Sequence, residues 1–211
     1  MEKLTFKTIT TQEETELVLQ KVESNLGVRL PDEYARNSKL VGVFLQGQLS
    51  ACYMLVTRPN FRSLLFIPDH IKKSIELLQN DQFEMMEVNG LWIGPSLKNP
   101  VMQLRVWSHL ILDIFMSKKR FVLLMQNSNN KCMERFMSMA TPQHIYEGEP
   151  LVMAGEKTHK TIRVSFTTRW SIVLSAPKYL KELLQRQKRA HVFSQKQTYL
   201  RSLKHSKSEF A

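Results

Sequence analysis

The 211-residue chain is poor in the residues that stabilise small secreted proteins or make a chain flexible. Two cysteines are too few for a disulfide framework, so we expect free thiols and a reducing, cytoplasmic location. Seven glycines and eight prolines exclude a collagen-like chain or a Gly-rich linker. The longest apolar run, near residues 106–116, is too short and too polar to span a bilayer. Residues 1–14 have no apolar segment typical of a signal peptide, and we expect none.

Motifs of several common enzyme classes are also missing. No Gly-x-Ser-x-Gly, Walker A or Gly-x-Gly-x-x-Gly pattern occurs, which removes the main support for a hydrolase, a P-loop protein or a Rossmann domain. The histidines lack zinc-ligand spacing and no Cys-x-x-Cys is present, so we expect no metal site. His109 and Asp113 lie one helical turn apart, which predicts a hydrogen-bonded pair on a helix rather than a catalytic triad.

Positive charge is abundant and unevenly distributed, with a formal net charge of +11. Residues 176–211 contain nine Lys or Arg and two Glu, whereas residues 1–175 contain 21 basic and 17 acidic residues. We therefore predict a domain over residues 1–175, followed by a basic amphipathic helix and polar tail over residues 176–211. This tail could bind an anionic membrane, nucleic acid or an acidic protein, or it could be a packed helix with a solvated charged face.

Hydrophobic periodicity and turn residues divide the chain into strands and helices. The expected strands are residues 4–9, 40–46, 49–57, 83–93, 121–126, 144–153 and 161–168. The expected helices are residues 12–26, 68–78, 100–118, 131–140 and 176–189, while residues 31–37 form a loop or a short helix. This order predicts a mixed α/β fold, with a mixed central sheet flanked by helices.

The central unit is a strand, a loop, a helix and a strand over residues 83–126. Asn99 and Pro100 are a preferred N-cap and first residue of a helix, whose positive N-terminal end favours an anion. In the context of the whole order, this unit resembles the GNAT (GCN5-related N-acetyltransferase) superfamily over about residues 1–170. The resemblance implies a GNAT-like fold, in which the loop and the helix N-terminus receive the pyrophosphate of acyl-CoA.

The resemblance also implies where the acyl donor binds. The family's loop usually reads Gln/Arg-x-x-Gly-x-Gly/Ala, whereas residues 96–103 contain no glycine. N-acyl amino acid synthases that accept acyl chains from an acyl carrier protein also have degenerate loops. This chain is similar to those enzymes in general character, and an acidic carrier protein would suit its basic surface. The implied donor-binding residues are Ile93, Gly94, Ser96, Lys98, Asn99, Val101, Asn127 and Asn130.

For catalysis, the resemblance implies transfer of an acyl group from acyl-CoA or acyl carrier protein to an amine. Glu87 is the candidate general base, and Glu84 is the second candidate. Alternation places Glu87 on one strand face with Met85, Asn89 and Leu91, where apolar neighbours would raise the pKa of its carboxyl group. The other interpretation of Glu87 is a strand-end residue facing water.

The family often has a tyrosine as general acid in the helix after strand 121–126. The corresponding helix has no tyrosine here, and Phe136 near that position would be inert, so Cys132 or Ser128 would have to serve. The alternative function is a non-catalytic binding module that keeps the GNAT fold, whose basic tail binds nucleic acid or an acidic protein partner.

Overall fold

The computed structural model describes residues 3–27, 29–97, 99–128, 131–151 and 161–185. Its centre is a seven-stranded sheet with the order β1-β2-β3-β4-β5-β7-β6. The β4–β5 pair is parallel, and the other neighbouring strands are antiparallel. The strands are β1 (Leu4–Thr8), β2 (Lys39–Leu45), β3 (Gln48–Val56), β4 (Met85–Ile93), β5 (Phe121–Asn127), β6 (Gln143–Gly148) and β7 (Ile162–Thr168).

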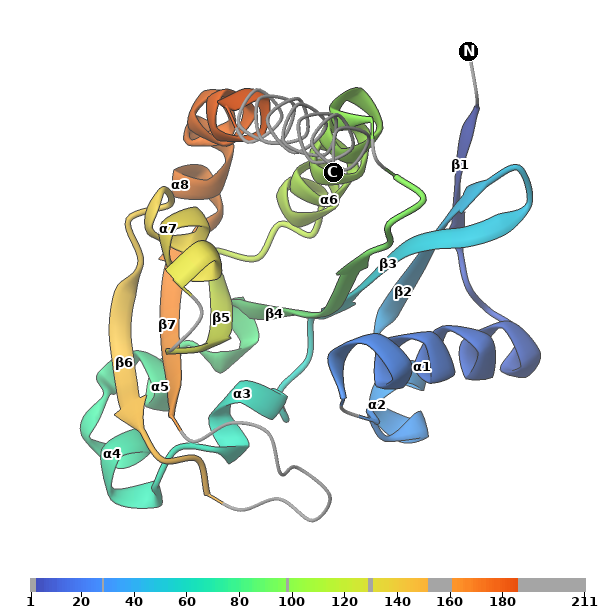
Figure 1. Ribbon diagram of the computed structural model, residues 1–211. Coiled ribbons are helices and arrows are strands. Elements are labelled where there is room, and N and C mark those ends of the chain that lie inside the picture. Colours follow the sequence, from blue (N-terminus) through green and yellow to red (C-terminus); the bar gives the residue numbers. More distant parts are fainter. Residues whose placement is uncertain (1–2, 28, 98, 129–130, 152–160, 186–211) are drawn as a thin grey trace, which may run out of the picture.

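Helices cover both faces of this sheet (Figure 1). One face carries α1 (Gln12–Leu26), α2 (Asp32–Arg36), α3 (Arg62–Leu65), α4 (Asp69–Ser74) and α5 (Glu76–Asn80). The other face carries α6 (Pro100–Met116), α7 (Lys131–Ser138), α8 (Arg169–Leu174) and a further helical segment at residues 176–185. A 3-10 turn, η1 (Gln82–Glu84), leads into β4. The predicted mixed sheet flanked by helices is therefore confirmed.

The two long helices begin where their caps predict. The Thr11 hydroxyl accepts a hydrogen bond from the Glu14 backbone N–H at the start of α1, and Gly27 ends the helix in the left-handed conformation with φ of 70°. The Asn99 side chain accepts a hydrogen bond from the Val101 N–H, and Pro100 is the first residue of α6. The capping contacts at these helix ends join residues that are close in the chain, which explains why the ends can be predicted from the sequence.

Two helical features differ from the prediction. The expected helix 68–78 is two short helices, because Ile75 between them is extended with φ of −104° and ψ of 105°. Helix α3 was not expected, since contacts from a distant strand stabilise its first turn, as described below. Helix α8 was also missed, although the Thr168 hydroxyl caps it by accepting a hydrogen bond from the Ser171 N–H. The expected strand 144–153 begins at Gln143 and ends at Gly148.

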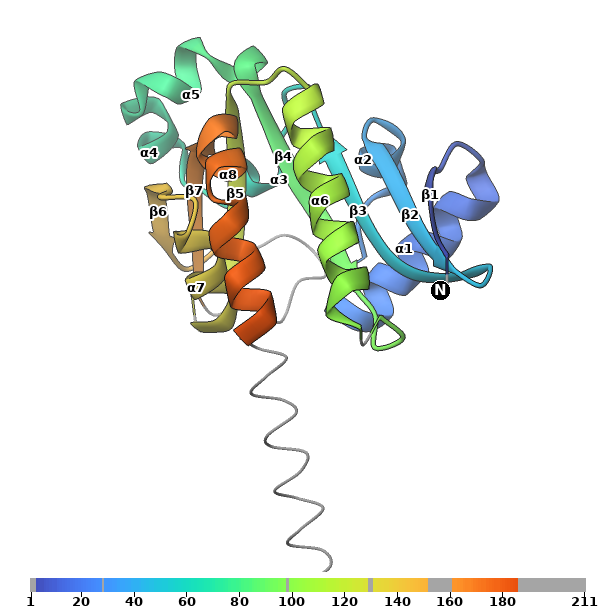
Figure 2. The same cartoon turned by 90° about the horizontal axis from the view of Figure 1, so that it is seen from above.

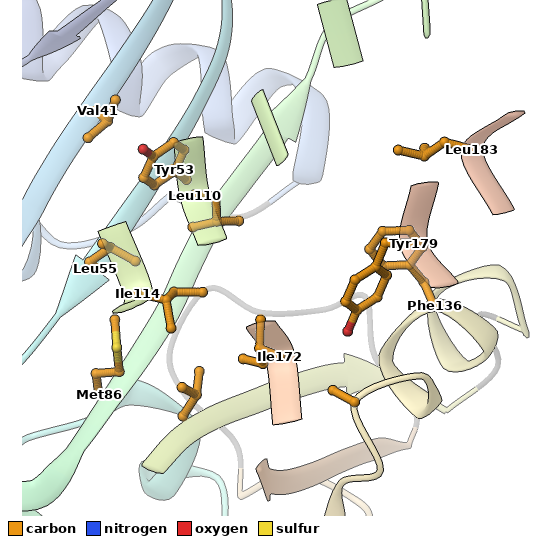
Figure 3. Close-up of a cluster of buried hydrophobic side chains, with 12 residues drawn as sticks. Val41, Tyr53, Leu55, Met86, Leu110, Ile114, Phe136, Ile172, Tyr179 and Leu183 are labelled. Atoms are coloured by element: carbon orange, nitrogen blue, oxygen red, sulfur yellow. The ribbon is translucent and has the colours of Figure 1, made fainter. Parts of the chain in front are cut away.

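The largest core cluster lies between the sheet and the face covered by α6, α7 and α8 (Figure 3). Aromatic rings from three helices meet there. The ring centroids of Trp107 and Phe136 are 4.4 Å apart, and those of Phe136 and Tyr179 are 4.6 Å apart. Tyr179 and Leu183 are buried in this cluster. Residues 176–185 thus pack on the domain, while residues 186–211 lie outside the described part of the chain.

Candidate functional site

The candidate site starts where β4 and β5 stop pairing. Their parallel ladder joins Met85 to Phe121, Met86 to Val122 and Glu87 to Leu123, and it ends there. Six further residues of β4 and four of β5 have no partner across this pair. Each strand keeps its outer neighbour, β3 for β4 and β7 for β5. The sheet is therefore split in the middle toward the carboxyl ends of the two strands.

A β-bulge in β4 accounts for the split. Cys52 pairs with Trp92 and Met54 pairs with Asn89, so Tyr53 faces two residues of β4, Gly90 and Leu91. Gly90 has φ of 56°, the left-handed conformation that glycine adopts without strain in such bulges. A bulge bends its strand and increases the local twist, which directs the end of β4 away from β5.

The bulge also corrects the predicted faces of β4. Met85 packs in the core beneath the sheet with α3 and α5, whereas Leu91 packs with α6 on the opposite face. Simple alternation had placed Leu91 on the same face as Met85, Glu87 and Asn89. The extra residue at Gly90 reverses the alternation, so this part of the prediction is wrong.

The loop after β4 is held by packing within the protein. The Gly94 N–H donates to the Ser50 carbonyl at 2.8 Å, and Leu97 is fully buried. A Cβ atom at Gly94 would lie 2.7 Å from the Trp92 ring and 2.9 Å from the Ser50 oxygen. Glycine at this position is thus required by close approach of the chain itself. Ile93 is half-buried and Ser96 is exposed, whereas Lys98 lies outside the described residues.

The N-terminus of α6 has fewer free backbone N–H groups than an uncapped helix. Its cap Asn99 accepts the Val101 N–H at 2.9 Å, and Pro100 has no N–H. The side chain of Val101 is half exposed beside this end. The positive end of the helix dipole remains, because it arises from the aligned peptide units of α6.

The carboxyl end of β5 lies at the same edge of the sheet as that of β4, since the two strands are parallel. Asn127 is the last residue of β5, and Ser128 follows it with its N–H bonded to the Thr161 carbonyl. These positions and the loop after β4 therefore flank the split from two sides. Asn130 lies outside the described residues, and so does the side chain of Cys132 in the first turn of α7.

Glu87 is the last residue of β4 that pairs with β5, and it is buried with 1% of its surface exposed. Its Oε2 accepts hydrogen bonds from the Tyr34 hydroxyl at 2.5 Å and the Arg62 backbone N–H at 2.8 Å. Its Oε1 accepts the Ser63 N–H at 2.9 Å. Glu87 thus caps the first turn of α3, and it is not the water-facing residue of the alternative interpretation.

Burial governs the ionisation of this cluster. It raises the pKa of Glu87 above the ordinary value, against the hydrogen bonds from Tyr34, Ser63 and Arg62 that lower it. Burial also lowers the pKa of the Arg62 guanidinium, against the charge of Glu87. The pKa of Tyr34 is raised by burial and by the Glu87 charge. Tyr34 and Arg62 were missed in the sequence because they lie 53 and 25 residues from Glu87.

A second polar cluster joins α6 to the sheet. The buried Tyr53 hydroxyl donates to Asp113 Oδ2 at 2.7 Å and lies 2.6 Å from His109 Nδ1. Lys39 Nζ lies 2.6 Å from Asp113 Oδ1, and the Phe6 ring stacks on the His109 ring at 4.2 Å. His109 and Asp113 lie together as predicted, but they are 3.6 Å apart and are joined through the Tyr53 hydroxyl rather than by a direct hydrogen bond. The cluster holds α6 in place over β1, β2 and β3.

No family model and no curated protein sequence matches the chain. Solved structures do match it. FeeM, an N-acyl amino acid synthase from uncultured soil microbes, has a TM-score of 0.56 and 10% identity, covering 82% of this chain and 94% of its own. A GCN5-related N-acetyltransferase from Brucella melitensis has a TM-score of 0.53 and 9% identity, covering 85% and 82%. The chain has the GNAT fold. A Bacillus subtilis acetyltransferase in complex with CoA shares this GNAT fold, with a TM-score of 0.50 and 10% identity over 79% of this chain and 99% of its own.

Among the described residues, no group of three or more His, Cys, Asp or Glu side chains could hold a metal ion. No helix in this part of the chain is long and apolar enough to cross a membrane.

Proposed function

We propose that the protein is an N-acyltransferase that moves an acyl group from a thioester donor to an amine. The observation that carries the proposal is the split between β4 and β5, which opens beside the N-terminus of α6. The opening between the two strands can hold the long arm of a thioester donor. The helix N-terminus beside it can bind the phosphates of that arm. The GNAT fold shared with FeeM and with a CoA-bound acetyltransferase supports the proposal.

The arm would enter at the carboxyl ends of the strands. Its phosphates would lie near the loop Gly94–Asn99 and Val101, with Lys98 supplying a positive charge. Asn127 and Asn130 would contact the arm from the β5 side. The unpaired edges of β4 and β5 carry backbone N–H and C=O groups, which can hydrogen-bond the amides of a pantetheine arm.

The chemistry would be direct attack of a neutral amine on the thioester carbonyl. The amine nitrogen forms the new C–N bond, the C–S bond breaks, and the amine proton ends on a base while the thiolate leaves. Glu87 is the candidate base, and its raised pKa suits that role. An amine would have to replace Tyr34 beside the carboxylate, because Tyr34 lies 2.5 Å from Oε2. Solvent, or Cys132 in α7, would protonate the thiolate.

The donor would be acyl-CoA or an acyl carrier protein, and FeeM is a neighbour whose product class is an N-acyl amino acid. The net charge of +11 would favour association with an acidic carrier. We place the enzyme in the cytoplasm, where both kinds of donor are made. The direct attack described above needs no metal.

The test is binding and product formation with both donors. The full chain would be titrated with CoA and with acyl-CoA of increasing chain length, using thermal shift and calorimetry. It would then be incubated with acyl-CoA or acyl carrier protein and a mixture of amino acids, and acylated products would be identified by mass spectrometry. Binding of CoA together with a new N-acyl product is the expected result. Neither binding nor product with either donor would refute acyl transfer.

The variant Val101→Asp tests the placement of the donor phosphates. An acidic residue in the first turn interacts favourably with the helix dipole, so the melting temperature should stay constant or rise. The same charge should repel a bound pyrophosphate and weaken CoA binding by about tenfold or more. The matched control Val101→Asn has nearly the same size without the charge and should bind like the wild type. Equal CoA affinities of the two variants would place the phosphates elsewhere.

A second function, a non-catalytic GNAT-fold module with a binding tail, has its own supporting observations. Glu87 is buried and hydrogen-bonded, and donors near the α6 terminus are engaged within the protein. A tail-binding module predicts salt-sensitive affinity for nucleic acid or an acidic protein. Truncation after Gln185 should abolish that affinity and leave the core intact, as measured by fluorescence anisotropy at two salt concentrations. Undiminished binding by the truncated chain would exclude the tail as the binding element.

A further inference from the structure

Helices α6 and α8 and residues 176–185 lie together on one side of the molecule (Figure 2). This side exposes large apolar side chains. Here we call this surface the α6–α8 face. Leu112 and Met116 project from α6 with 55% and 63% of their surface exposed. Trp170 and Leu174 project from α8 with 53% and 74% exposed. Leu180 and Leu184, one helical turn apart, continue the exposed apolar surface along residues 176–185.

These side chains belong to one continuous surface. A shallow cleft of about 320 Å³ runs between α6 and α8. It is lined by Ser108, Ile111, Leu112 and Phe115 on one side and by Trp170, Val173 and Ala176 on the other. The Phe115 and Trp170 rings meet edge to face at 5.2 Å. Met116 lies one turn beyond Leu112, and Leu180 one turn beyond Ala176. The exposed apolar groups therefore extend from both walls of the cleft.

The exposed charges on this face are positive. Arg105, Lys118, Arg120, Lys178 and Lys181 are exposed on or beside its helices. The Arg169 guanidinium lies 5.7 Å from the Phe115 ring centre and 5.8 Å from that of Trp170.

The two acidic residues within residues 99–120 and 169–185 are Asp113 and Glu182, and both are withdrawn from solvent. Asp113 pairs with Lys39 and Tyr53, and Glu182 is buried and pairs with Arg135 at 3.1 Å. The face therefore combines exposed apolar groups with exposed positive charge.

We propose that the α6–α8 face docks the protein onto the surface of an anionic lipid bilayer. Apolar side chains that project from the protein, with a half-exposed tryptophan among them, suit the boundary between headgroups and acyl chains. The surrounding lysines and arginines suit the headgroup phosphates. An acidic protein helix fits less well, because the cleft is small and its walls project outward. This inference is independent of the proposed acyl transfer.

Vesicle binding tests the proposal. The full chain would be mixed with vesicles of phosphatidylcholine alone or of phosphatidylcholine with an equal part of phosphatidylglycerol, and the bound fraction measured by flotation. We expect binding to the anionic vesicles, little binding to the neutral ones, and weaker binding at high salt. Failure to bind the anionic vesicles would overturn the proposal, and an acidic protein would then be the better candidate partner of this face. Equal binding to neutral vesicles would overturn the anionic requirement.

Substitutions locate the contact. Met116→Glu combined with Leu174→Glu places two charges where the bilayer would lie and should weaken binding by about tenfold or more. The control Leu17→Glu makes the same change at a half-exposed position of α1, across the sheet, and should bind like the wild type. If the double variant binds as tightly as the wild type, the charge of another region is responsible and the proposal is wrong.

Fluorescence gives a readout that does not depend on a loss of binding. Insertion of the exposed Trp170 should shift the emission to shorter wavelength when anionic vesicles are added. Trp170→Phe keeps an aromatic group and should still float with the vesicles, but it should lose this shift. A shift that persists unchanged in Trp170→Phe would show that Trp170 does not enter the bilayer, which contradicts docking in the proposed orientation.

Discussion

Replacing Glu87 by alanine should lower the free energy of unfolding by about 3–5 kcal/mol, because it leaves three hydrogen-bond donors in a buried cluster without their acceptor. The substitution leaves the Tyr34 hydroxyl and the N–H groups of Arg62 and Ser63 without their acceptor. It also leaves the buried Arg62 guanidinium without the compensating charge of Glu87. Urea unfolding followed by circular dichroism would measure the loss.

Two further variants separate the causes. Glu84→Ala removes an exposed carboxylate three residues away and should change stability by no more than about 0.5 kcal/mol. Glu87→Gln keeps one acceptor oxygen, but its amide NH₂ group would face the N–H and O–H donors that surround the carboxylate. It should therefore lower the free energy of unfolding by less than alanine does, by about 1–3 kcal/mol. A loss below about 1 kcal/mol in Glu87→Ala would show that the cluster tolerates an empty acceptor position, contrary to the expectation for buried unpaired groups.

The pH dependence of the same variants has a definite sign. Burial raises the pKa of Glu87 above its ordinary value of 4.5, so the folded protein holds this proton more tightly than the unfolded chain. Stability contributed by the group is complete below the unfolded pKa and is lost as the pH rises through the folded pKa. The advantage of the wild type over Glu87→Gln should therefore be largest near pH 4 and decline as the pH rises. A difference that grows with pH would contradict a raised pKa.

The order of strands and helices was predictable because its signals are local. The Thr11 cap, the terminal Gly27 and the Asn99–Pro100 pair each act within a few residues, and the structure places α1 and α6 accordingly. The β2–β3 hairpin has its turn at Gln46 and Gly47, both of which have positive φ. The continuous apolar run of β5 likewise indicates a strand buried on both faces of the sheet, and Val122 and Leu123 pack in two different core clusters.

The details of the candidate site were less predictable, since they depend on residues that are distant in the chain. The isolated Gly90 within a strand is a signal that could have indicated the bulge. The register of the bulge is set by pairing with Tyr53 on β3, which is distant in the sequence. Glu87 was identified as a candidate residue, but its partners Tyr34 and Arg62 come from α2 and α3, which lie 53 and 25 residues earlier in the chain. The start of α3 depends on these contacts, which explains why that helix was missed.

The split and the polar cluster adjoin each other in the structure. Glu87 is both the last residue of β4 that pairs with β5 and the acceptor that fixes α3 beneath it. The bulge at Gly90 follows three residues later. The segment of β4 that pairs with β5 therefore ends at Glu87, where the two strands separate. The position of the opening is thus set by a residue that is buried and hydrogen-bonded. Substitutions of Glu87 are consequently expected to change activity through geometry as well as through proton transfer.

Truncation after Ser175 should destabilise the domain by about 3–6 kcal/mol, because it removes the buried Tyr179 and Leu183 from the core. Without Tyr179, the Phe136 and Trp107 rings lose an aromatic neighbour and become exposed to water. A loss of this size is comparable to the whole stability of many domains, about 5–15 kcal/mol. Thermal and urea unfolding of the truncated chain would measure it.

The matched control is truncation after Gln185, which removes the rest of the chain and keeps the helical residues 176–185. It should unfold within about 1 kcal/mol of the full chain, since no residue of the described core is lost. Equal stability of the two truncated proteins would mean that residues 176–185 contribute little to the core, against the burial of Tyr179 and Leu183. Loss of partner binding after truncation at Ser175 would reflect damage to the core as much as loss of the tail, whereas loss after truncation at Gln185 would reflect the tail alone.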